Sequence, residues 1–103
     1  MNQFDVFENP EGARQANVPY VITIQSEHFI NARTTVVVPL VRNATPKMLE
    51  AVNPTFEIKS ERLTLEPFQI AFIPVARLRK KVASLADERV AIVRAVDALM
   101  SGL

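Results

Sequence analysis

The stretch TTVVVPLV, residues 34–41, is rich in β-branched side chains and is interrupted once, by Pro39. Valine and threonine favour extended backbone because their branched side chains pack well on a pleated surface. The stretch therefore predicts a strand. A proline cannot donate a hydrogen bond to a neighbouring strand, so Pro39 is expected at an edge or a bend of the sheet.

Short segments with period-two alternation of apolar residues surround this strand. Strands are expected over residues 3–7, 20–25, 56–58, 63–65, 70–73 and 75–78. Phe4 and Val6 fall on one side of the first of them, and Pro74, which separates the last two, marks a second edge or bend. Most of the chain is therefore expected to form a sheet of short strands.

Two connections between these strands carry signals of their own. The sequence KSER, residues 59–62, predicts a hairpin turn that contains no glycine. Residues 45–52 predict a short helical turn, because Thr45 can cap it, Pro46 suits its first position and Pro54 follows it.

The last fifth of the chain changes to a helical period. Apolar residues fall on one helical stripe at positions 85, 92, 96, 99 and 103, and Val93 and Met100 widen that stripe on one flank. Residues 84–87 fit a capping box at the start of a helix, and Gly102 suits the left-handed conformation that ends one. A C-terminal helix is therefore expected.

The end of this helix is expected to expose a mixed surface. Arg94, Asp97 and Ser101 fall opposite the apolar stripe. Leu103 follows the predicted helix stop, where a polar and dispensable residue would be usual. Leu103 is therefore expected either to return to the core or to contact another molecule.

Length and composition exclude several classes of protein. The 103 residues suit a single domain, 1–103, and contain no cysteine, so they provide no disulfide scaffold and no thiol nucleophile. Twelve Lys and Arg residues face eleven Asp and Glu residues, a balance that argues against a dedicated nucleic-acid binder. No apolar run approaches the roughly 20 residues that span a bilayer, and no signal-peptide pattern is present. A soluble, cytoplasmic protein is expected.

Residues that usually carry catalysis or bind cofactors are scarce. The single histidine, His28, leaves the usual zinc ligand sets incomplete, and two glycines cannot form a Gly-rich nucleotide-binding loop. No metal, cofactor or catalytic residue is therefore expected. The one basic cluster, RLRKK at residues 77–81, could touch phosphate, although such a run more often lies in solvent. These patterns indicate a small α+β domain that binds another molecule.

Several stretches together resemble the CcdB toxin family. They are QFDVF at residues 3–7, PYVITIQSEHFINARTTVVVPL at 19–40, NPTFEI at 53–58, IAFIPVARL at 70–78 and the Gly-Leu that follows the helix. They occur in the family's order along nearly the whole chain. The resemblance implies an α+β, mainly β fold: an SH3-like antiparallel barrel with a small extra sheet and a C-terminal helix.

The resemblance also implies a function. CcdB proteins are homodimeric toxins of type II toxin–antitoxin systems, known from plasmid maintenance; they bind the A subunit of DNA gyrase and trap the cleaved DNA complex without being enzymes. A CcdA-type antitoxin neutralises them. By position, the family's gyrase-binding surface falls here on His28, Phe29, Asp97, Met100, Ser101, Gly102 and Leu103.

Some of these positions allow other interpretations. Ser101 stands where the best-known family member has a tryptophan that stacks on gyrase, and Asp97 stands where it has asparagine. Phe29 is expected in the core rather than at a contact, Met100 suits the core or a dimer interface as well as a target, and Asp97 can pair with Arg94 at i, i+3. Two other functions stay open: a MazF-like mRNA endoribonuclease, and a non-toxic relative that only binds antitoxin, which Ser101 motivates.

Overall fold

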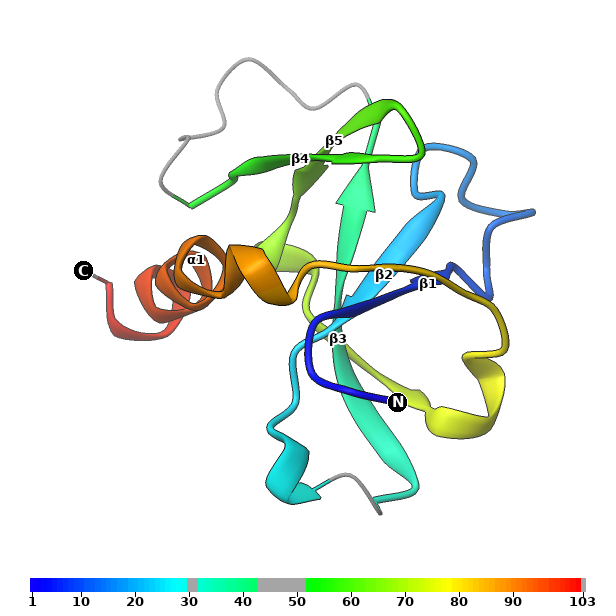
Figure 1. Ribbon diagram of the computed structural model, residues 1–103, viewed down its shortest axis with the longest axis horizontal. Coiled ribbons are helices and arrows are strands. Elements are labelled where there is room, and N and C mark those ends of the chain that lie inside the picture. The colour runs from blue at the N-terminus through cyan, green and yellow to red at the C-terminus, as the bar shows by residue number, and fades with distance from the viewer. Residues whose placement is uncertain (30–31, 43–51, 103) are drawn as a thin grey trace.

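The computed structural model describes residues 1–29, 32–42 and 52–102. Its strands are β1 (Asp5–Glu8), β2 (Tyr20–Thr23), β3 (Thr34–Val41), β4 (Thr55–Ile58), β5 (Glu61–Leu65), β6 (Ala71–Pro74) and β7 (Lys81–Ser84). They form one antiparallel sheet that curls into a half-barrel, with the α-helix α1 (Arg89–Ser101) against it (Figure 1). The mainly β class with a C-terminal helix is confirmed.

The long strand β3 organises the sheet because it pairs with three others. Its first half pairs with β6, its last two residues, Leu40 and Val41, pair with β5, and β2 runs along its other side. Pro39 lies where the neighbour changes from β6 to β5, and its carbonyl accepts the N–H of Glu66 at 3.0 Å. The N–H and C=O groups of a strand residue point to the same side of the strand. The N–H that proline lacks would therefore point to the side where β6 ends and β5 begins, away from β2, so no hydrogen bond between β3 and β2 is lost. Pro39 thus lies inside a continuous strand, at a point where the pairing partner on one side changes.

The glycine-free hairpin is also confirmed, with a shorter turn than expected. Ile58 pairs directly with Glu61, so only Lys59 and Ser60 form the turn between β4 and β5. Both turn residues are left-handed, with φ of 51° and 66°. Two consecutive positive φ values match the twist of a two-residue hairpin. This hairpin is the small extra part of the sheet, joined to the rest through the end of β3.

The strand expected over residues 75–78 is wrong. Val75 still donates its N–H to the carbonyl of Arg33 at 2.8 Å, beside the last β3–β6 pair, but the N–H of Leu78 then returns to the carbonyl of Val75 at 3.0 Å. This second bond closes the 3₁₀ turn η3 (Val75–Arg77), after which Leu78 is buried. The chain then returns to the sheet as β7, a strand that the sequence did not predict. The helical turn expected over residues 45–52 falls almost entirely on residues 43–51, outside the described ranges.

The sheet buries side chains on both faces because neighbouring strand residues point in opposite directions. One cluster includes Phe4, Val6, Ile22, Val38, Leu40, Phe56, Ile58, Leu63, Leu65, Leu85, Ile92 and Ala95. A smaller cluster on the other face holds Phe7, Val21, Val37 and Leu78. The helix α1 covers the larger cluster through Ile92 and Ala95, which are fully buried. The position of α1 is therefore fixed by the main core.

The two ends of the helix differ in how well the sequence predicted them. The Ser84 hydroxyl accepts the N–H of Ala86 at 3.3 Å, and the 3₁₀ turn η4 (Ala86–Glu88) follows, so α1 begins at Arg89 without the expected capping box. At the other end Gly102 is left-handed, with φ of 72°, and its N–H reaches the carbonyl of Ala98 at 3.0 Å. The predicted helix stop is confirmed. Within the described ranges, no helix has the length and apolar character that crossing a membrane requires.

Candidate functional site

The end of α1 lies at one extremity of the molecule (Figure 1), and its last turn carries a set of exposed side chains. Asp97, Met100, Ser101 and Gly102 are all exposed, and Met100 retains 75% of its accessible surface. Met100 therefore does not belong to the core of its own chain, although it lies next to the stripe that does. Leu103, the remaining candidate at this end, lies outside the described residues.

Hydrogen bonds within the last helical turn set what it can offer to a partner. The Ser101 hydroxyl donates to the carbonyl of Asp97, 2.7 Å away. The hydroxyl is thus engaged with the backbone of its own helix. Among the ion pairs formed by described residues, none joins Asp97 to Arg94, so the expected i, i+3 pair is not formed. The exposed carboxylate of Asp97 and the thioether of Met100 are the groups that face outward.

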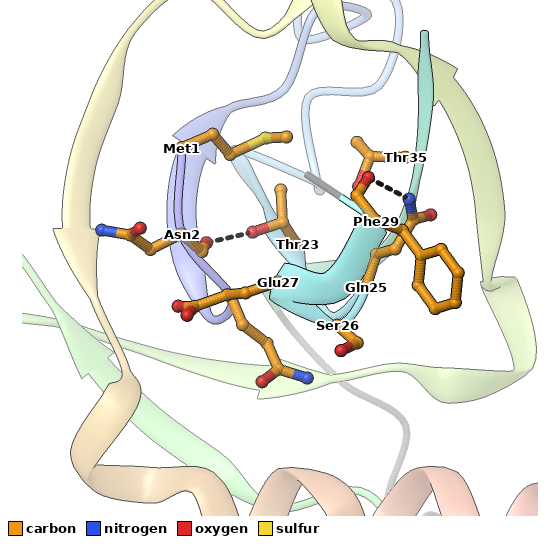
Figure 2. Close-up of a pocket in the computed structure, with 9 residues that line it drawn as sticks. Met1, Asn2, Thr23, Gln25, Ser26, Glu27, Phe29 and Thr35 are labelled. Atoms are coloured by element: carbon orange, nitrogen blue, oxygen red, sulfur yellow. Dashed lines mark hydrogen bonds between the residues drawn. The ribbon is translucent and has the colours of Figure 1, made fainter. Parts of the chain in front are cut away.

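The second group of candidates, His28 and Phe29, lies on the 3₁₀ turn η1 (Glu27–Phe29). Phe29 is 63% exposed, so its expected place in the core is wrong. Gln25 explains the difference: its amide nitrogen donates to the carbonyl of Phe29 at 3.2 Å (Figure 2). Its amide oxygen accepts the N–H of Val36 in β3 at 3.1 Å. Gln25 anchors the turn to the sheet by its backbone, which leaves the Phe29 ring free to point outward.

A cavity of about 10 Å³ lies beside η1, between this turn and the first residues of the chain (Figure 2). The carbonyl of Asn2 accepts a hydrogen bond from the Thr23 hydroxyl at 3.0 Å on its wall. A space of this size holds about one water molecule and no larger ligand. The function of this region therefore depends on its surface and not on an enclosed site.

The two groups of candidate residues lie at different edges of the molecule (Figure 1). Contacts between side chains nevertheless connect the segments that carry them. Arg89, at the start of α1, donates to the amide oxygen of Gln3 at 3.1 Å, and its guanidinium lies 5.6 Å from the centre of the Phe4 ring. Gln3 in turn donates to the carbonyl of Ile24, just before η1, at 3.1 Å. No sequence pattern indicates this link, because Arg89 and Gln3 are 86 positions apart.

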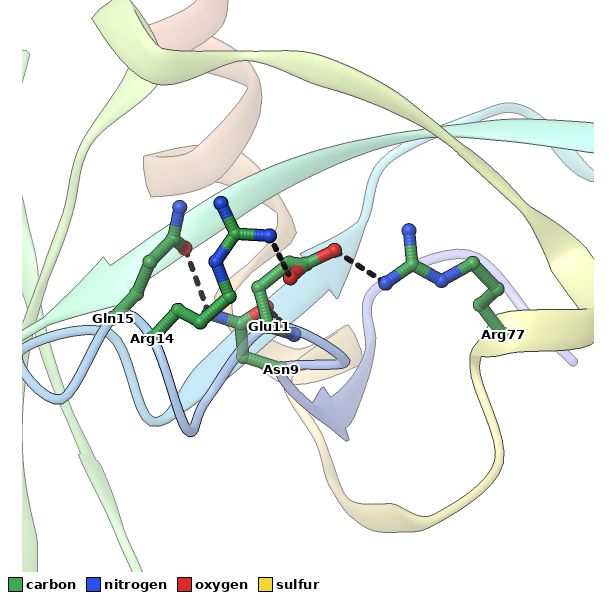
Figure 3. Close-up of polar contacts among 5 residues, drawn as sticks. All are labelled: Asn9, Glu11, Arg14, Gln15 and Arg77. Atoms are coloured by element: carbon green, nitrogen blue, oxygen red, sulfur yellow. Dashed lines mark hydrogen bonds and ion pairs between the residues drawn. The ribbon is translucent and has the colours of Figure 1, made fainter.

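The basic cluster at residues 77–81 is largely neutralised within the chain. Arg77 pairs with Glu11 in the N-terminal loop (Figure 3), Lys80 with Glu8 at 3.7 Å, and Lys81 with the buried Asp5 at 3.2 Å. The hydrogen bond and positive charge of Arg77 lower the pKa of Glu11 below its ordinary value. Three of the four cations in the cluster thus have a carboxylate partner within the chain, which lowers the net positive charge that the cluster presents to a phosphate backbone.

A further exposed surface was missed by the sequence prediction. Phe68, Ile70 and Phe72 follow one another at alternate positions along the 3₁₀ turn η2 (Pro67–Gln69) and β6, and all three are exposed, Phe72 to 77%. The sequence predicted a strand over residues 70–73 but did not indicate which of its side chains are exposed. Several large apolar side chains exposed in one segment usually mark an interaction surface.

Comparison with known proteins identifies the family of this chain. A family model described as CcdB protein matches residues 3–102, which include both η1 and the exposed end of α1. A comparison with curated proteins returned no match. The matched range covers nearly the whole chain and includes all the strands and the C-terminal helix described above. The chain belongs to the CcdB family, the toxins of toxin–antitoxin modules.

Proposed function

We propose that this chain is a gyrase poison: a cytoplasmic toxin that binds the A subunit of DNA gyrase and traps the complex with cleaved DNA, without catalysing a reaction itself. Membership of the CcdB family supports the toxin role. The observation that carries the finer assignment is the end of α1, where Asp97, Met100 and Ser101 stand exposed on a helix whose other face is anchored in the core. Contact groups on a rigid element are held in place before binding.

A homodimer suits this function because the gyrase A subunits themselves form a two-fold assembly. A two-fold ligand can engage both halves of such a target equally. The exposed side chains of Phe68, Ile70 and Phe72 supply an apolar surface for self-association. We place the dimer interface on this segment, which would set the ends of two α1 helices in a fixed relation to each other.

The toxin acts by differential affinity. A ligand shifts a conformational equilibrium only by the difference between its affinities for the two states. To move gyrase from about 1% to about 99% in the cleaved state, the toxin must bind that state roughly 10⁴-fold more tightly than the intact one. The carboxylate of Asp97 can accept hydrogen bonds or pair with a cation, and the flexible side chain of Met100 adapts to an apolar pocket.

A CcdA-type antitoxin is the expected inhibitor. The loop that follows β1 is a candidate contact for it, because its backbone is held in place and its tip stays exposed. Asn9 donates its side-chain amide to Gln15 at 3.0 Å and to the carbonyl of Val18 at 2.9 Å, while Arg14 remains at the surface (Figure 3). A rigid loop loses little conformational entropy when a partner binds.

One observation favours a second candidate, a relative that binds antitoxin but no longer poisons gyrase. The Ser101 hydroxyl is bonded to Asp97 in its own helix, so Ser101 offers a partner neither an aromatic ring nor a free donor. The two candidates differ in one measurable property, the trapping of cleaved DNA.

The deciding experiment mixes the purified chain with gyrase from its own host and plasmid DNA, and counts double-strand breaks. A gyrase poison produces breaks that depend on gyrase and disappear when residues 101–103 are removed or when Met100→Glu is introduced. Glu57→Gln, at an exposed position of β4, serves as the control and should leave the breaks unchanged. Intact, cycling gyrase at saturating toxin would refute the poison and favour the antitoxin-binding relative; cleavage of added RNA would favour the endoribonuclease.

A further inference from the structure

The backbone of Phe4 joins the two segments that carry the candidate contact groups. The N–H of Phe4 donates to the carbonyl of Thr23, at the end of β2, at 2.6 Å. The carbonyl of Phe4 accepts the N–H of Leu85, which directly precedes η4 and α1, at 2.8 Å. Since η1 follows β2 after three residues, Phe4 connects the chain that leads into η1 with the chain that leads into α1.

Phe4 makes this connection in a strained conformation. Its φ is 69°, in the left-handed region, where the Cβ of a residue other than glycine crowds the following carbonyl oxygen. Among the other described residues, glycine apart, positive φ is confined to the turn between β4 and β5. Strained conformations persist where surrounding contacts over-determine them, and they are concentrated at functional sites. The strain at Phe4 belongs to the junction of the two segments and not to a hairpin turn.

The side-chain amide of Gln3 connects the same two segments a second time. Its nitrogen donates to the carbonyl of Ile24 at 3.1 Å, and its oxygen accepts a hydrogen bond from Arg89 at 3.1 Å. The guanidinium of Arg89 also lies 5.6 Å from the centre of the Phe4 ring, a cation–π contact that helps to hold Arg89 in place. An amide supplies both a donor and an acceptor, whereas a carboxylate supplies acceptors only.

The connection continues to the candidate groups on both sides. Gln25, next to Ile24, is bonded to the carbonyl of Phe29 in η1 and to the N–H of Val36 in β3. Arg89 is the first residue of α1, which runs without interruption to its exposed end at Ser101. Hydrogen-bond networks and rigid secondary elements are the structures that carry coupling between distant sites.

We propose that Gln3 is a positioning residue, whose amide holds η1 in a fixed place relative to α1. The exposed groups of the turn and those of the helix end are thereby presented together, as one surface in two parts. Contact groups that are already fixed relative to each other lose less conformational entropy when a partner binds. That this surface meets gyrase rests on the proposed function. The coupling between the two segments depends only on Gln3 and its partners.

The first test measures the coupling in the full-length chain without gyrase, by amide hydrogen exchange followed by NMR. The reporter is the N–H of Phe29, which bonds to the carbonyl of Ser26 within η1. Arg89→Leu, on another element, is expected to accelerate exchange at Phe29 roughly two- to tenfold, the effect of weakening one hydrogen bond. Arg94→Leu is the matched control, because Arg94 is an exposed arginine on the same helix, and exchange at Phe29 should be unchanged.

Two substitutions of Gln3 then separate the two ends of its amide. Gln3→Glu keeps an acceptor for Arg89 but removes the donor to Ile24, and Gln3→Met removes both. Both are expected to accelerate exchange at Phe29 to the same extent, while the melting temperature shows that each variant stays folded. Unchanged exchange at Phe29 in these variants, or an equal response to Arg89→Leu and Arg94→Leu, overturns the proposal.

A double-mutant cycle connects the positioning role to the target. Affinity for the dimerisation region of the gyrase A subunit is measured for Gln3→Met, for Arg89→Leu and for the chain that carries both. If Arg89 acts through Gln3, the double variant is expected to bind no more weakly than the weaker single variant. Losses that add would show two independent contacts and would overturn the positioning role. A wild-type chain that does not bind gyrase would remove the proposed function, and the exchange measurements would still decide the coupling.

Discussion

Ser101 donates its hydroxyl hydrogen to the carbonyl oxygen of Asp97, 2.7 Å away and one helical turn earlier. Together with the bond from Gly102 to Ala98, this contact closes the last turn of α1 on its own backbone. The side chains of this turn that remain available to a partner are therefore the Asp97 carboxylate and Met100. This arrangement makes the role of Ser101 testable.

Ser101→Ala is expected to leave gyrase trapping unchanged, because the hydroxyl it removes is bonded within the helix. Ser101→Trp is expected to increase potency roughly three- to tenfold, since an exposed ring adds stacking worth about 0.5–1.5 kcal/mol. The measurement is the toxin concentration that gives half-maximal double-strand breaks. A large loss of potency in Ser101→Ala would show that the hydroxyl itself contacts gyrase.

Ile92→Ala is expected to destabilise the fold by about 2–5 kcal/mol, because it opens a cavity beneath the helix. Ile92 is fully buried in the larger cluster that joins α1 to the sheet. Val90→Ala, on the exposed face of the same helix, is the control and should change stability by less than about 0.5 kcal/mol. Urea unfolding measures both, and equal effects of the two substitutions would contradict the assignment of the helix faces.

The hairpin turn between β4 and β5 is expected to gain stability from glycine and asparagine. Lys59 and Ser60 both have positive φ, which costs an ordinary residue roughly 1–2 kcal/mol. The double substitution Lys59→Asn with Ser60→Gly should therefore raise Tm by several degrees. Ser84→Gly, in β7, is the matched control and should lower Tm. A lower Tm for the double variant would show that the turn is not left-handed.

The two arginine–glutamate pairs should be visible in carboxyl titrations. The hydrogen bond from Arg77 and then its charge lower the pKa of Glu11 below 4.5, and the hydrogen bond from Arg42 does the same for Glu61. Since the folded pKa values are depressed, each pair stabilises the fold above about pH 4.5 and loses that contribution as the pH falls further. NMR titration of the carboxyl carbons measures both values. Arg77→Gln should return Glu11 toward 4.5 and leave Glu61 unchanged; a wild-type Glu11 midpoint at 4.5 would contradict the pair.

The sequence predicted elements where one local pattern decided the outcome. The β-branched run that forms β3, the hairpin and the glycine that ends α1 each depend on neighbouring residues alone. It failed where hydrogen bonds that the residue pattern does not show decided the outcome. The N–H of Leu78 turns back to the carbonyl of Val75 and closes a 3₁₀ turn, and Phe29 points outward from a turn that Gln25 joins to Val36 of β3.

The candidate site shows the same division. The exposure of Asp97 and Ser101 follows from helical geometry and was predicted correctly. The exposure of Phe68, Ile70 and Phe72 was not predicted, because alternation does not tell which face of a strand another element covers. The exposed apolar face of α1 was also missed: Val93 and Met100 fall next to the inward stripe in the sequence pattern, and only the packing shows that both are exposed.

The central claim is that the end of α1 binds gyrase, and isothermal titration calorimetry tests it most directly. The wild-type chain and a chain lacking residues 101–103 are each titrated into the isolated dimerisation region of the gyrase A subunit from the same host. The wild-type protein is expected to bind as a dimer, and the shortened protein to lose measurable affinity while it keeps the same oligomeric state and Tm. Equal affinity of the two proteins would contradict the account.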